Sequence, residues 1–94
     1  MALKTFEFVV HGRVQGVGFR HFVATTARTD GIVGWVKNHS NGTVVGLAQG
    51  DEEKLAKFKQ DLAAGPPYAY VSKLKFSNES DVSQLQYRSF NIVH

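Results

Sequence analysis

HGRVQGVGFR, residues His11–Arg20, marks the point at which the chain changes its type of secondary structure. Before it, residues 4–11 alternate polar and apolar side chains, which is typical of a half-buried strand. From Phe19 onward the apolar side chains recur at helical spacing, and Gly31 is placed to end that helix. The stretch therefore predicts a glycine-rich turn that joins a strand to a helix.

The same stretch has the composition of an anion-binding loop. Its glycines at positions 12, 16 and 18 let successive backbone N–H groups turn toward one centre, and the following helix adds unpaired first-turn donors. Arg20 adds a guanidinium that can bind two phosphate oxygens at once. Phe19 and Arg20 follow the last glycine, so the spacing differs from that of P-loops and dinucleotide-binding loops. A small phosphate fits better than a nucleotide, and an ordinary turn with a surface arginine is the alternative on these residues alone.

The rest of the chain continues the alternation of strands and helices. Asn41-Gly42 is a strong hairpin signal between two β-patterned runs. Asp51 is a good N-cap and opens a second helical pattern, which stops at Gly65-Pro66-Pro67. The further elements predicted are strands at residues 32–39, 43–50, 69–76 and 85–93, with a polar loop from Ser77 to Ser83 between the last two.

The predicted order of elements is βαββαβ with an added short strand. This order is that of the split βαβ, ferredoxin-like arrangement, an α+β sandwich with a mainly antiparallel sheet and two helices on one face. The fold alone does not decide the function, because many activities share it. The core is expected to include Phe6, Phe8 and Val10 from the first strand and Leu55, Phe58 and Leu62 from the second helix.

Length and charge limit the classes of protein to consider. The 94 residues are enough for one domain, residues 1–94, and the absence of cysteine excludes disulfides and thiolate chemistry. A net charge of +3 favours anionic partners, but the basic residues are scattered and the charge is modest for a nucleic-acid binder. No leader-like or membrane-spanning apolar run is present. We expect a soluble, cytoplasmic monomer that binds neither nucleic acid nor membrane.

A second segment gives the glycine-rich stretch a family context. Gly34–Asn38 reads GWVKN and is followed by Asn41-Gly42. Together with GRVQGVGFR, these residues resemble the signature of the acylphosphatases, most closely the animal type, over nearly the whole chain. The resemblance implies hydrolysis of the carboxyl–phosphate bond of small acyl phosphates. It also implies that inorganic phosphate or sulfate binds as a product-like ligand, with no metal, no cofactor and no covalent intermediate.

The resemblance also implies roles for particular residues. Arg20 binds the phosphoryl group, and Asn38 orients the attacking water without accepting its proton. Because the chain of animal-type relatives ends near the catalytic arginine, the terminal carboxylate at His94 is expected to orient Arg20. The phosphate-binding backbone is expected to comprise Gln15, Gly16, Val17, Gly18, Phe19 and Arg20.

Other interpretations of individual residues remain open in the sequence. His11 and His21 flank the glycine-rich stretch, so a general base or a phosphohistidine is an alternative to exposed histidines. A non-enzymatic module that uses its sheet to bind RNA or a protein is the competing function. However, the expected central strand, TVVGLAQG, has no aromatic side chain for base stacking. No carboxylate and histidine cluster has the spacing of metal ligands, so no metal is expected.

Overall fold

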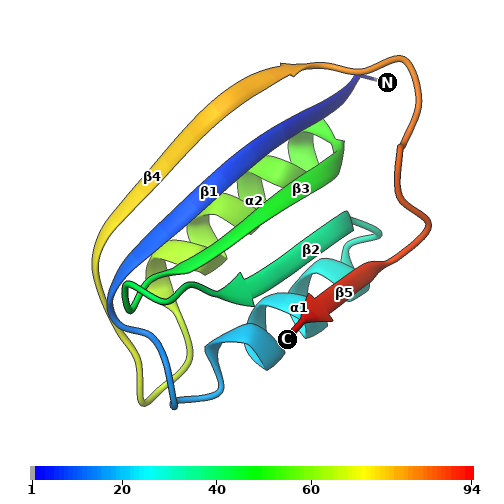
Figure 1. The fold of residues 1–94 in the computed structure, drawn as a ribbon. Helices are drawn as coiled ribbons and strands as arrows, with labels where there is room; N and C mark the ends of the chain where they lie inside the picture. The colour runs from blue at the N-terminus through cyan, green and yellow to red at the C-terminus, as the bar shows by residue number, and fades with distance from the viewer. Residues whose placement is uncertain (1) are drawn as a thin grey trace.

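The computed structural model describes residues 2–94 and consists of two layers, a five-stranded sheet and two helices that cover one of its faces (Figure 1). This arrangement confirms the predicted ferredoxin-like α+β class and the predicted order of elements. The elements are β1 (Leu3–Arg13), α1 (Phe19–Thr29), β2 (Val33–Asn38), β3 (Val44–Asp51), α2 (Glu52–Ala64), β4 (Tyr70–Asp81) and β5 (Phe90–Val93).

The order of strands in the sheet is β4-β1-β3-β2-β5. Neighbouring strands are antiparallel except β2 and β5, which run parallel, so the sheet is mainly antiparallel as predicted. The middle strand, β3, lies between β1 and β2. As a result, the end of β1 that leads into the glycine-rich loop and the end of β2 that carries Asn38 are brought to the same side without pairing with each other.

The core lies between the sheet and the two helices. Phe6, Phe8 and Val10 of β1 point into it and are buried, as the alternation in the sequence predicts. From α2, the ring of Phe58 lies 6.0 Å from that of Phe8 and 6.1 Å from that of Phe90 in β5. Aromatic rings at such separations pack edge to face, which holds α2 against the sheet. In residues 2–94, no helix is long and apolar enough to cross a membrane.

The second helix begins as the sequence predicts. The side chain of Asp51 accepts a hydrogen bond from the backbone N–H of Glu53 at 2.9 Å, and Glu52 and Glu53 place negative charge in the first turn. The helix ends before Gly65, which caps it and precedes the two prolines. The predicted inward residues, Leu55, Phe58 and Leu62, are all buried.

We expect Asp51→Ala to lower the free energy of unfolding by about 1 kcal/mol, because one first-turn N–H of α2 loses its acceptor. Urea denaturation of the variant and the parent measures this difference. The glycine-rich loop should stay unaffected, since Asp51 lies at the end of β3 away from it. An unchanged free energy of unfolding would contradict the role of the cap.

Two predictions about the last third of the chain were wrong. The segment from Ser77 to Ser83 was predicted as a polar loop, but β4 continues to Asp81, with Ser77 paired to Glu7 and Ser80 to Thr5. Because β4 is an edge strand with an exposed face, it can consist of residues with polar side chains. The long β1 provides the backbone hydrogen-bonding partners that extend it. Conversely, the strand predicted at residues 85–93 is limited to Phe90–Val93.

Candidate active site

A hollow of about 170 Å³ lies at the end of the sheet where β1 leaves it and α1 begins. Figure 1 shows the tips of β2 and β5 and the start of α1 at this same end of the molecule. The hollow combines backbone of the glycine-rich loop, polar side chains and an apolar wall. It is lined by Val14, Gly16, Gly18, Phe19, Arg20, His21, Asn38, Ile92 and His94.

The glycine-rich loop provides unpaired donors to this hollow. Gly16 and Gly18 have φ angles of +75° and +77°, in the left-handed region that side chains disfavour, and Gly18 is the N-cap of α1. Among residues 2–94, no backbone hydrogen bond of a turn, loop or helix cap has its N–H donor in residues 15–20. No acidic residue lies in the first turn of α1. The loop therefore offers a concentration of free N–H groups at a positive helix end, which favours an anion.

Arg20 places a cation beside these donors. It is the second residue of α1 and is half-buried, and its Nη1 lies 3.4 Å from Nδ1 of His94. None of the ion pairs in the described residues joins Arg20 to a carboxylate. Its charge is therefore available to an anionic ligand in the hollow. The α1 helix is itself fixed beside β5, because Nε of Arg28 donates to the carbonyl of Phe90 at 3.0 Å.

Asn38 enters the hollow from the sheet. It is the last residue of β2 and, by the alternation of the strand, shares the helix-facing side with the buried Val36. Its side-chain oxygen Oδ1 is buried and has no hydrogen-bonding partner among residues 2–94. Buried polar atoms are nearly always satisfied, so an orphaned amide oxygen in a hollow indicates a place for a donor that comes from outside the protein.

The comparisons with known proteins agree with this arrangement. The family model for acylphosphatases matches residues 6–92, which span the glycine-rich loop, Arg20 and Asn38. The chain is 50% identical to Acylphosphatase-2 of Bos taurus over 91 residues, which cover 96% of this chain and 92% of that protein. Acylphosphatase-2 of Homo sapiens is 46% identical over 92 residues, which cover 97% and 93% of the two chains.

The chain belongs to the acylphosphatase family. The structures agree as well. The crystal structure of acylphosphatase from Bacillus subtilis matches with a TM-score of 0.89 and 38% identity, covering 97% of this chain and 99% of that one. The resemblance to the family is confirmed, and with it the assignment as an acylphosphatase enzyme.

Not every residue expected in the acylphosphatase loop faces the hollow. Gly16, Gly18, Phe19 and Arg20 line it, but Gln15 and Val17 do not. Val17 packs half-buried against the core, and the side chain of Gln15 is directed to the turn between β2 and β3. The phosphate-binding role expected for residues 15–20 rests on their backbone N–H groups, so it stays a prediction.

The histidines occupy different positions around the site. His21 is exposed and lines the hollow, whereas His11 lies in β1 opposite Lys73. The terminal carboxylate was expected to orient Arg20, but the contact in the structure is made by the imidazole ring of His94. Sequence reasoning also missed the apolar wall formed by Val14 and Ile92, because the pattern of apolar residues does not show which of them border the hollow. In residues 2–94, no group of three or more histidine, cysteine, aspartate or glutamate residues is placed to hold a metal ion.

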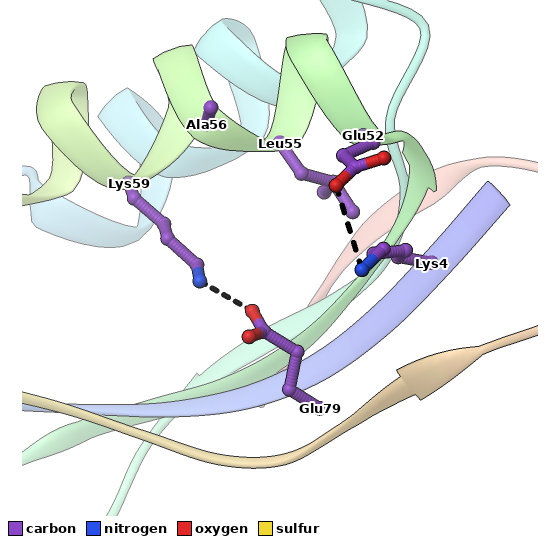
Figure 2. A pocket seen from close by; sticks show the side chains of 6 residues that line it. All are labelled: Lys4, Glu52, Leu55, Ala56, Lys59 and Glu79. Carbon is purple, nitrogen blue, oxygen red and sulfur yellow. Dashed lines mark hydrogen bonds and ion pairs between the residues drawn. The ribbon is translucent and has the colours of Figure 1, made fainter. Parts of the chain in front are cut away.

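A second hollow, also of about 170 Å³, lies near the start of β1, at the opposite end of that strand from the glycine-rich loop (Figure 2). Its cations are already paired. Lys4 lies 3.5 Å from Glu52 and 3.6 Å from Asp81, and these carboxylates raise the pKa of the Lys4 ammonium. Lys59 forms an ion pair with Glu79, and this hydrogen bond lowers the pKa of the Glu79 carboxyl. With its charges compensated, this hollow offers no free cation to a phosphate.

Proposed function

We propose that this acylphosphatase hydrolyses the carboxyl–phosphate bond of small acyl phosphates by in-line attack of a water molecule on a phosphoryl group held by Arg20 and the glycine-rich loop. The observation that carries the proposal is the orphaned Oδ1 of Asn38 in the same hollow as the uncompensated guanidinium of Arg20. One group can orient a water and the other can bind a phosphoryl group. Both are present within a single hollow.

The chemistry of an acyl phosphate explains why so few groups are needed. The leaving carboxylate has a low pKa, so no general acid has to protonate it. The catalyst must bind the phosphoryl oxygens, stabilise their charge in a loose transition state and place a water in line. Arg20 and the N–H groups of residues 15–20 provide the first two. No step of this scheme requires a metal, a cofactor or a covalent intermediate.

Asn38 supplies the third requirement. Its amide oxygen accepts a hydrogen bond from the water and fixes the direction of a lone pair, but it is too weak a base to take the proton. We assign the role of acid or base to no side chain. As the water oxygen bonds to phosphorus, the carboxylate leaves with the electron pair of the broken P–O bond, and the protons of the water stay on the inorganic phosphate that is released. Inorganic phosphate and sulfate are expected to occupy the same position as product-like ligands, and we take the working enzyme to be a cytoplasmic monomer.

RNA binding is not favoured by the placement of the aromatic side chains. Such a function needs aromatic residues on the central strands of the sheet. The middle strand, β3, has the sequence VVGLAQGD and carries none. Of the other candidates for stacking, Trp35 stands by itself on the inner strand β2. Tyr68, Tyr70 and Tyr87 lie in a loop, on the edge strand β4 and in the segment before β5. An anion-binding hollow is therefore the better-supported function.

Turnover of benzoyl phosphate in excess chelator tests the reaction. We expect full activity with chelator present and, in ¹⁸O-water, incorporation of the label into inorganic phosphate rather than benzoate. With ³²P-labelled substrate, an alkaline quench should trap no labelled protein. The quench is alkaline because a phosphohistidine at His21 would survive it and be detected. Loss of activity in chelator, label in benzoate or a trapped phosphoenzyme would each contradict the mechanism.

Inorganic phosphate is expected to inhibit the enzyme competitively and to raise its melting temperature. A ligand that binds only the folded state stabilises it by about 2.7 kcal/mol at a concentration of 100 times its Kd. Thermal denaturation at increasing phosphate, with ionic strength held constant by sodium chloride, measures the shift. A melting temperature that does not respond to phosphate would contradict a preformed anion site.

A further inference from the structure

The side chain of Gln15 connects two parts of the molecule that the backbone does not connect directly. Its Nε2 lies 2.7 Å from the carbonyl oxygen of His39 and 2.9 Å from that of Thr43. Because both partners are acceptors, the amide nitrogen with its two N–H groups must face them. Gln15 itself belongs to the glycine-rich loop, between the buried Val14 and Gly16.

Both carbonyls that Gln15 contacts close the turn between β2 and β3. The oxygen of Thr43 also accepts from the backbone N–H of His39 at 2.9 Å, and the oxygen of His39 accepts from that of Gly42 at 3.1 Å. Asn41 completes the turn, because its Oδ1 accepts from the backbone N–H of Thr43 at 3.0 Å and from the Thr43 hydroxyl at 2.6 Å. With the Gln15 amide included, the carbonyl oxygens of His39 and Thr43 therefore each accept from two donors. The turn is stabilised by hydrogen bonds within it and by the side-chain amide of Gln15.

This contact matters because of what lies next to each end. The residue before His39 is Asn38, and the residues after Gln15 form the loop that leads to Arg20. The strands β1 and β2 that carry these segments are separated by β3 and do not pair. Among the described residues, no other side-chain hydrogen bond joins residues 14–19 to residues 38–43. The Gln15 amide is thus the direct polar connection between the two halves of the hollow.

We propose that Gln15 is a positioning residue that sets the place of Asn38 relative to the anion-binding loop, and hence the line of attack of the water. This inference rests on the proposed function, in which Asn38 holds that water. In-line attack depends on distance and angle, and a misplacement of about 1 Å lowers a rate by about 10²-fold. Phosphate binding depends on Arg20 and on backbone N–H groups, so it should depend much less on the Gln15 side chain.

Gln15→Met tests the proposal, because methionine keeps a long unbranched side chain and removes both donors. We expect kcat for benzoyl phosphate to fall by about 10- to 100-fold, with the inhibition constant of inorganic phosphate changed by less than about twofold. Gln60→Met makes the same chemical change on the exposed face of α2 and is the matched control. Its kcat should equal that of the parent.

A double-mutant cycle separates positioning from a general structural role. If Gln15 acts through Asn38, then Gln15→Met should lower kcat by less than about twofold in an Asn38→Ala background, since the group that it positions is gone. A loss as large in that background as in the parent would overturn the proposal. So would an unchanged kcat in the single variant, or a fall in kcat matched by an equal loss of phosphate binding.

Gln15→Asn guards against a variant that does not fold. It keeps an exposed amide on the loop and withdraws it by one methylene, so it cannot reach both carbonyls, and the same fall in kcat without loss of phosphate binding is expected. A phosphate-induced rise in melting temperature shows that each variant is folded. Failure of the parent to hydrolyse benzoyl phosphate, or an unchanged kcat in Asn38→Ala, would contradict the proposed function itself. Additive losses in an active parent would contradict only the role of Gln15.

Discussion

Arg20→Ala is expected to lower kcat/KM for benzoyl phosphate by about 10³-fold or more, the scale on which an arginine stabilises a transferring phosphoryl group. In the structure Arg20 lines the hollow without a carboxylate partner. No other lysine or arginine is among the described residues that line this hollow, so none takes its place when it is removed. Steady-state kinetics measure the loss. The same variant should show no rise in melting temperature with inorganic phosphate.

Arg20→Lys should recover little of this loss. The guanidinium presents a planar fork that binds two oxygens, whereas an ammonium is a point charge on a flexible stem. Arg88→Ala is the matched control, because Arg88 is exposed in the segment before β5 and lines neither hollow. Near-parental activity in the lysine variant would contradict two-point binding by Arg20, and a loss of activity in the control would show that net charge alone is responsible.

Asn38→Ala is expected to lower kcat by about 10²- to 10³-fold, the loss usual for one preorganised polar group. The inhibition constant of inorganic phosphate should change little, because the variant retains Arg20 and the free N–H groups of the loop. We expect kcat to fall without a loss of phosphate binding because Oδ1 of Asn38 has no partner among the described residues, so its removal breaks no internal hydrogen bond. For the same reason the melting temperature should hardly change.

Asn91→Ala provides a comparison, because Asn91 is an exposed residue of β5, the strand that pairs with β2. It should retain parental kcat and phosphate inhibition. If Asn38→Ala lost phosphate binding, kcat and melting temperature together, Asn38 would be a structural residue of the turn. Its assigned role in orienting the water would then be wrong.

The elements governed by a strong local pattern could be predicted from the sequence. The alternation around Phe6 and Phe8 gave β1 its buried face, and Asp51 with the following glutamates gave α2 its start. The extent of β4 could not be predicted in this way. Its last residues are polar and carry no strand pattern, and they extend because β1 offers them backbone partners across the sheet.

The site shows the same division. The glycine spacing pointed to Arg20, and the resemblance of GRVQGVGFR and GWVKN to the acylphosphatases pointed to Asn38, so both residues could be named before the fold was known. The contact from Gln15 to the turn that follows Asn38 joins residues 24 and 28 positions apart, and no local pattern records it. The ring of His94 reaches Arg20 across 74 positions for the same reason.

The place of β3 in the sheet has a consequence for folding. The glycine-rich loop follows β1 and Asn38 ends β2, yet the strand that holds both in register, β3, comes after them in the chain and inserts between them. The two halves of the site therefore cannot approach their final separation until this later strand has paired on both of its edges. Pairings of this kind are non-local and form slowly. Any partly folded form that lacks β3 between its neighbours has Arg20 and Asn38 but not the hollow that they line. If these residues act as proposed, the catalytic rate of a refolding sample counts only molecules in which β3 has paired with both β1 and β2.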